Sequence, residues 1–111
     1  MSEIITLKLN KDFRRLYSRG KSYVSPILVT YVCKNKNHSI RYGITTSKKI
    51  GKAVVRNKAK RLVREAYREL LPEIKSGYDF VFVARGKTPY VKSYNIKKCM
   101  QEHMKKAGVL K

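Results

Sequence analysis

The chain has 111 residues, which is enough for one domain and too few for two, so residues 1–111 are expected to form a single domain. Its 27 lysines and arginines outnumber its 7 aspartates and glutamates and give a formal net charge of +20. An excess of this size favours a polyanionic partner, which is either nucleic acid or an anionic membrane. No run of residues is apolar enough for a membrane span or a signal peptide, so we expect no membrane partner and a cytoplasmic protein.

The first half of the chain is predicted to hold a short helix followed by strands. Asn10 is a good N-cap for a helix over residues 11–19, and Gly20 is a good residue to end it. Residues 26–34 and 39–46 are rich in β-branched and aromatic side chains, and the polar turn between them predicts a hairpin.

The second half is predicted to alternate helix, strand and helix. Helical spacing of apolar residues runs over residues 53–70 and ends before Pro72, which cannot continue a helix. Residues 79–84 (DFVFVA) are almost continuously apolar, as in a central strand covered on both faces, and residues 93–107 form another amphipathic helix. With one more short strand near Tyr23, the order is α-β-β-β-α-β-α. The fold class is then α+β, a small α–β sandwich with helices packed on a four-stranded mixed sheet. General rules would make its strand–helix–strand crossover right-handed.

The predicted helix over residues 53–70 carries its cations on one side. On a helical wheel with about 100° per residue, the apolar residues form one stripe, and an adjoining arc of about 140° is cationic. The residues of this cationic arc are Arg56, Asn57, Lys60, Arg61, Arg64 and Arg68. Like charges at i,i+4 cost about 0.2–0.5 kcal/mol per pair, so an ordinary solvated face mixes signs. A row of cations that opposes helix stability indicates an external polyanion. The apolar stripe lacks the large side chains of a membrane-surface helix, so it is interpreted as a face that packs on the core.

The sequence contains no catalytic constellation. Its acidic residues form no cluster able to hold two metal ions against a phosphodiester, and Asp79 is interpreted as a strand-edge residue. His38 lies in a predicted turn and His103 on the last helix, so nothing brings them together for acid–base cleavage. There is no phosphate-binding glycine loop and no metal-ligand spacing. These residues predict a binding protein with no catalytic residue, no metal and no cofactor of its own.

Aromatic residues beside cations suggest contact with unpaired RNA. Phe13 and Tyr17 are one helical turn apart, and Tyr31 alternates with Val29 and Cys33 on one face of a strand. Such side chains can stack on unpaired bases. Aromatic residues on amphipathic elements are more often part of the core, and the spacing alone leaves both interpretations open.

Several stretches of the chain together resemble the protein component of bacterial ribonuclease P. The longest, residues 48–65 (KKIGKAVVRNKAKRLVRE), is similar to the RNR signature of that family. The other matching positions are Leu7, Lys8, Asp12, Phe13, Tyr17, residues 19–22 and residues 79–85. Tyr17 stands where many members of the family carry Phe, so its hydroxyl would leave stacking intact and add a hydrogen bond of its own.

The resemblance implies a fold, an activity and partners. Members are small basic α–β sandwiches whose strand–helix–strand crossover is left-handed, and they assemble with one large catalytic RNA. That RNA, with bound Mg²⁺, removes the 5′ leader of precursor tRNA by endonucleolytic hydrolysis. The chain would then be the accessory subunit of an endoribonuclease, with the catalytic RNA subunit and precursor tRNA as partners. The Mg²⁺ would enter through the RNA subunit. The protein alone is expected to be inactive, and monomeric when free.

The resemblance also implies which residues bind RNA. Phe13, Tyr17 and Tyr31 would line a cleft for the 5′ leader, between the first helix and the sheet. The residues that would contact the RNA subunit are Lys48, Lys49, Lys52, Arg56, Asn57, Lys60, Arg61, Arg64 and Arg68. One alternative is a ribosomal or general RNA-binding protein without a processing role. Another, a stand-alone metal-dependent nuclease, is disfavoured by the scattered acidic residues.

Overall fold

The computed structural model describes residues 5–7 and 9–111, without the side chains of Ile5 and Lys48. Its helices are α1 (Asn10–Arg19), α2 (Ala53–Leu70) and α3 (Ser93–Ala107). Its strands are β1 (Ile5–Thr6), β2 (Lys21–Val24), β3 (Leu28–Lys34), β4 (Ile40–Thr46) and β5 (Tyr78–Ala84). Short 3-10 helices at Lys48–Ile50, Leu71–Glu73 and Thr88–Tyr90 lie in the connections. The predicted α+β class is confirmed, and α2 and α3 have the predicted bounds.

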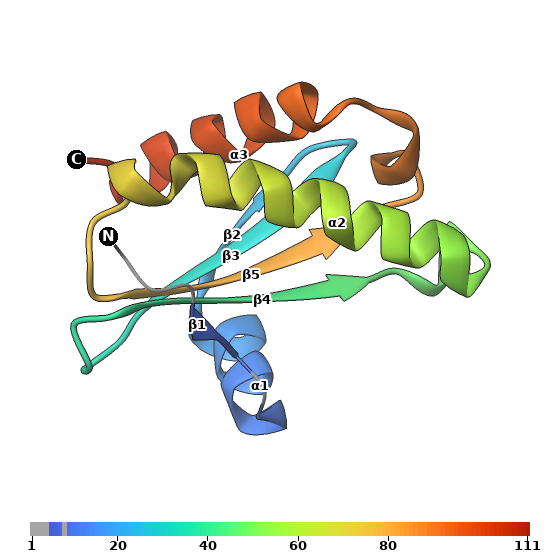
Figure 1. Cartoon of the computed structure of the whole chain (residues 1–111). Coiled ribbons are helices and arrows are strands. Elements are labelled where there is room, and N and C mark those ends of the chain that lie inside the picture. Colours follow the sequence, from blue (N-terminus) through green and yellow to red (C-terminus); the bar gives the residue numbers. More distant parts are fainter. Residues whose placement is uncertain (1–4, 8) are drawn as a thin grey trace.

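The strands form one twisted sheet in the order β1-β4-β5-β3-β2, with β5 at its centre (Figure 1). β4 runs parallel to β5, whereas β3 is antiparallel to both β5 and β2, so the predicted mixed sheet is confirmed. All four predicted strands are present. The two-residue β1, which pairs parallel with β4, is an addition too short to leave a pattern in the sequence.

The predicted hairpin between residues 26–34 and 39–46 is wrong, because β5 lies between β3 and β4 and pairs with both. The connection from β3 to β4 closes instead around the start of β5. The Asn35 N–H donates to the Gly77 carbonyl at 2.9 Å, and the Gly77 N–H donates to the Ser39 carbonyl at 2.9 Å. The largely buried, apolar β5 takes the central place because such a strand needs cover on both faces and partners on both edges.

The helices are divided between the two faces of the sheet, with α2 and α3 on one face and α1 on the other (Figure 1). Phe80 and Phe82 of β5 are fully buried in the larger core cluster together with Tyr67 of α2. Val81 points to the opposite face and packs in a second cluster with Leu16 of α1. The prediction that residues 79–84 form a central strand covered on both faces is therefore confirmed.

The β4–α2–β5 crossover is left-handed. In Figure 1, β4 and β5 both point to the right, α2 lies above them, and β4 is in front of β5. A right-handed connection would place β5 in front in this view, so the general rule does not hold for this unit. The handedness implied by the family resemblance does hold.

The two ends of α1 differ from their predictions. Leu9, and not Asn10, is the N-cap residue, and its carbonyl accepts a hydrogen bond from the Asp12 N–H at 3.0 Å. Gly20 has a φ of −75°, so it does not end the helix as a left-handed cap. Glycine is required there for space, because a Cβ would lie 2.6 Å from the carbonyl oxygen of Leu16.

Candidate nucleic-acid interface

α2 presents the predicted cationic arc away from the core. Arg56 and Lys60 are half-buried, and the other arc residues are exposed. The buried residues of the helix are Ala59, Val63, Ala66, Tyr67 and Leu70. Within the described part of the chain, no cation of the arc has an acidic partner, since the ion pairs there use Arg15, Arg41 and Lys97. The wheel thus predicted the direction of these charges correctly.

The turn before α2 places further cations at the start of the helix. Ser47 Oγ accepts a hydrogen bond from the Lys49 N–H at 3.2 Å, and Gly51 has a φ of 107°, which favours glycine. Lys49 and Lys52 are exposed on this turn, whereas the side chain of Lys48 lies outside the described residues. The first turn of α2 has no acidic residue, so the partial positive charge of the helix N-terminus adds to that of the lysines.

Phe13, Tyr17 and Tyr31, which we call the aromatic cluster, meet on the face of the sheet that carries α1. The rings of Tyr17 and Tyr31 make an edge-to-face contact with centroids 4.9 Å apart. Phe13 lies against the backbone of Gly43, where a Cβ would come within 2.6 Å of its ring. Tyr17 is 43% exposed, while Phe13 and Tyr31 are half-buried and pack against the smaller core cluster. The rings therefore pack against the core and still leave part of their surface exposed, and their contact with unpaired bases stays a prediction.

The hydroxyl of Tyr17 lies 3.2 Å from Oγ1 of Thr45 on β4, within hydrogen-bond distance. Thr45 is therefore a partner for the Tyr17 hydroxyl, and a phenylalanine at this position could not make this hydrogen bond. The contact connects α1 to the end of β4, and β4 leads directly into Ser47 and the lysine turn. The aromatic cluster is thereby linked through one strand to the start of the cationic arc.

The surface beside the aromatic cluster continues toward the ends of the strands. Register places Val29, Val83 and Thr45 in one row across β3, β5 and β4, and all are half-buried. Val24 pairs with Val29 at the sheet edge and is 65% exposed. These residues are not among the site residues predicted from the sequence. The alternation of Val29 with Tyr31 was a usable signal, whereas Val83 and Thr45 became neighbours only through strand pairing.

Asp79, the second residue of β5, does lie at the edge of its strand, but it is also fully buried beneath α1 and binds several side chains, which the sequence did not predict. Its carboxylate accepts hydrogen bonds from Arg41 Nη2 at 2.7 Å and Arg41 Nε at 2.9 Å, and it also pairs with Arg15. Asn35 Nδ2 donates to it at 2.8 Å. Burial raises the pKa of this carboxyl, but the hydrogen bonds from Arg41, Asn35 and Arg15 outweigh burial and hold the pKa below its ordinary value.

No metal-binding or acid–base centre accompanies these surfaces in the part of the chain that the structure describes. Over residues 5–7 and 9–111, no three histidine, cysteine, aspartate or glutamate side chains gather as a metal site. His38 is exposed in the connection between β3 and β4. His103 is buried on α3, with Nδ1 at 2.8 Å from Thr30 Oγ1, and burial lowers its pKa. None of the described helices is long and apolar enough to cross a membrane.

The sequence model of the family Ribonuclease P matches residues 1–108. The "Ribonuclease P protein component" of Clostridium botulinum (strain 657 / Type Ba4) is 47% identical over 104 residues, which are 93% of this chain and 94% of that protein. The protein of the same name from Clostridioides difficile is 43% identical over 104 residues, or 93% of this chain and 91% of that protein.

Solved structures give the same result. The RNase P protein of Staphylococcus aureus superposes with a TM-score of 0.84 at 34% identity, covering 98% of this chain and 100% of that chain. The RNase P protein of Thermotoga maritima has a TM-score of 0.80 at 32% identity, covering 91% of this chain and 96% of that chain. Because the family model matches residues 1–108 and each of these relatives covers more than nine-tenths of the chain, the chain belongs to the ribonuclease P protein family.

Proposed function

We propose that this chain, as the protein subunit of ribonuclease P, binds the catalytic RNA through the cationic arc of α2 and the 5′ leader of precursor tRNA through the aromatic cluster. Ribonuclease P is an endoribonuclease whose catalytic RNA is a separate molecule, so the task of the protein is binding. The observation that carries the proposal is the row of α2 cations without acidic partners among the described residues.

Phosphate neutralisation explains why such a row exists. In the free protein, the like charges of the arc repel one another along the helix. Packed RNA phosphates would remove that repulsion and release their condensed counterions. Affinity for the RNA subunit should therefore fall steeply with salt, with a log–log slope of about −0.7 to −0.9 for each phosphate contacted.

The aromatic cluster is suited to unpaired nucleotides. Tyr17 is 43% exposed, and its ring is held by the edge-to-face contact with the half-buried Tyr31. Base–aromatic stacking is tolerant of sequence, as a subunit that meets many different leaders requires. Because β4 joins Thr45 to the lysine turn, a leader on the cluster would lie next to RNA bound at α2.

We place the Mg²⁺ needed for cleavage on the RNA subunit. The one fully buried carboxylate among the described residues, Asp79, already accepts from two arginines and an asparagine and has no free position for a metal ion. We also propose that the free protein is a monomer and that it acts in the cytoplasm, where tRNA is matured.

Reconstitution tests the proposal. The purified chain and a bacterial catalytic RNA should together cleave precursor tRNA at the 5′ end at Mg²⁺ concentrations where the RNA alone is slow. No gain over the RNA alone would overturn it. Cleavage by the protein alone that a chelator abolishes would point to a metal nuclease.

A second measurement separates a processing subunit from a general RNA-binding protein. The reconstituted complex should bind precursor tRNA more tightly than mature tRNA, because only the precursor carries a leader for the aromatic cluster. Equal affinity for the two tRNAs would indicate general RNA binding.

A further inference from the structure

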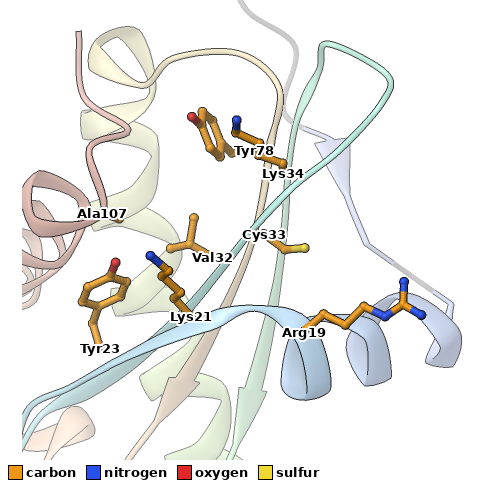
Figure 2. Close-up of a pocket in the computed structure, with 8 residues that line it drawn as sticks. All are labelled: Arg19, Lys21, Tyr23, Val32, Cys33, Lys34, Tyr78 and Ala107. Carbon is orange, nitrogen blue, oxygen red and sulfur yellow. The ribbon is translucent and has the colours of Figure 1, made fainter.

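A pocket of about 300 Å³ lies on the face of the sheet that carries α3, at the β2–β3 edge (Figure 2). Strand register explains its lining, because Lys21 pairs with Val32 and Lys34 pairs with Tyr78, and paired residues point to the same face. Alternation along β2 puts Tyr23 on that face as well. The sheet thus gathers two lysines and two tyrosines around one buried valine.

The side chains leave an opening between them. Figure 2 shows Lys21 and Tyr23 on one side of it and Lys34 and Tyr78 on the other, with Val32 between them. Ala107, the last residue of α3, borders the pocket as well. Arg19 also belongs to the lining, but its guanidinium points away from the opening, toward α1 (Figure 2).

The charge in this pocket is uncompensated. No acidic residue lines it. Among the described residues, the ammonium groups of Lys21 and Lys34 take part in no ion pair or hydrogen bond, and neither do the hydroxyls of Tyr23 and Tyr78. Two ammonium groups over an apolar floor repel each other and attract an anion.

The apolar part of the pocket lining indicates which class of anion would bind there. The rings of Tyr23 and Tyr78, with Val32 and Ala107, offer a surface for a flat heterocycle next to the lysines. Cations beside tyrosine rings are the usual means of holding unpaired nucleotides, through phosphate contacts and base stacking. A volume of about 300 Å³ is at the small end of ligand pockets and suits one nucleotide rather than a duplex.

We propose that this pocket binds a single unpaired nucleotide, with its phosphate between Lys21 and Lys34 and its base against a tyrosine ring. The carboxyl end of α3, at Ala107, carries partial negative charge, which keeps the phosphate on the lysine side. The nucleotide is either a residue of an RNA strand or a free mononucleotide, since both present the same chemistry.

This pocket lies apart from the two surfaces of the proposed function. β2 and β3 end the sheet opposite to β4, which leads into α2, and the aromatic cluster lies on the other face. The test uses the free protein without the catalytic RNA, so its outcome does not depend on the proposed function.

The test is a titration of the ¹⁵N-labelled protein with 5′-AMP, followed by amide chemical shifts, with adenosine and inorganic phosphate in parallel. A 5′-phosphorylated unpaired dinucleotide forms the RNA arm. Salt near 0.15 M limits diffuse attraction, since the Debye length is then about 8 Å. We expect shifts at residues 21–23, 32–34 and 78, and weaker binding of adenosine and of phosphate than of 5′-AMP.

Matched variants locate the site. Lys21→Ala/Lys34→Ala should weaken binding about tenfold, because both charge-assisted hydrogen bonds to the phosphate are removed. Lys92→Ala/Lys98→Ala removes the same charge from exposed positions elsewhere and should leave binding within about twofold. Tyr23→Leu removes one stacking surface, and thermal unfolding checks that each variant is folded.

The outcomes are distinct. Binding of 5′-AMP that depends on the pocket lysines supports the proposal with a free nucleotide as a sufficient ligand. Lysine-dependent binding of the dinucleotide alone supports it with RNA as the source. Equal weakening in the two double-lysine variants, or shifts confined to α2, would overturn it, because binding would then follow net charge and not this pocket.

Discussion

Arg15 of α1 and Asp79 of β5 form an ion pair across the face of the sheet that carries the aromatic cluster. Arg15 lies between Phe13 and Tyr17 in the chain, so the pair fixes the helical turn from which both rings project. The same carboxylate holds Arg41 of β4 and Asn35 of the connection that follows β3. One buried group therefore fastens three separate parts of the chain beneath the proposed leader-binding surface.

Replacing Asp79 by Asn should destabilise the protein and loosen α1. The guanidinium groups of Arg15 and Arg41, whose side chains are 27% and 21% exposed, would be deprived of a charged partner that water replaces only in part. We expect the free energy of unfolding in urea to fall by about 1–3 kcal/mol. The control is Glu69→Gln, which removes the exposed pair with Lys97 at 3.5 Å and should cost less than about 1 kcal/mol. An Asp79→Asn protein as stable as the wild type would mean that the ion pairs of Asp79 do not hold the fold.

Lowering the pH should remove the contribution of the Asp79 carboxylate to the free energy of unfolding. Its pKa is lower in the folded protein than in the unfolded chain, where an aspartate titrates near about 3.9. The unfolded chain therefore binds the proton first, and the stability that Asp79 contributes is present above that pKa and is lost as the pH falls through the folded value. The difference in unfolding free energy between the wild type and Asp79→Asn should shrink as the pH falls below about 5. If this difference in unfolding free energy does not change with pH, the charge of the Asp79 carboxylate does not stabilise the protein.

Removing two cations of the arc should weaken RNA binding and leave folding unchanged. Arg64 and Arg68 are exposed and have no acidic partner among the described residues, so Arg64→Ala/Arg68→Ala should alter stability by no more than about 0.5 kcal/mol per site. Affinity for the catalytic RNA should fall, and the log–log salt slope should become shallower by about 0.7–0.9 for each phosphate that the variant no longer neutralises. Lys92→Ala/Lys98→Ala is the charge-matched control. Equal weakening of RNA binding in both variants would argue against a directed interface on α2.

Two substitutions at Tyr17 separate its ring from its hydroxyl. Tyr17→Phe removes only the hydrogen bond to Thr45, so the preference for precursor over mature tRNA should persist. Tyr17→Ala removes the stacking surface and should reduce that preference by about 1–3 kcal/mol, the usual value of one base–aromatic stack. Measured with the reconstituted complex, an unchanged preference in Tyr17→Ala would remove this ring from the leader-binding surface.

Local patterns predicted the elements of this fold that depend on local interactions. The apolar spacing of α2 and the stop at Pro72 indicated both ends of the helix, and the spacing also indicated the direction of its cations. The apolar run of β5 correctly indicated a strand covered on both faces.

Non-local interactions account for the features that local sequence patterns did not predict or predicted wrongly. Asp79 finds Arg15 and Arg41 at sequence separations of 64 and 38 residues, and no local pattern announces such partners. The hairpin prediction failed for the same reason, since the polar turn after β3 has no feature that shows a later strand inserting beside it. The hydrogen bond of Tyr17 to Thr45 likewise exists only because β4 is placed next to β5.

The central position of β5 has a consequence for how the protein is made. Until residues 78–84 leave the ribosome, β3 and β4 each expose an unpaired edge, and such edges are templates for aggregation. The sheet can close only when a late segment inserts between two earlier ones, which requires long loops to close and slows folding. Nascent chains should therefore remain unfolded until late in synthesis. The excess of positive charge, which is +20 over these 111 residues, would keep neighbouring unfinished chains apart during that interval.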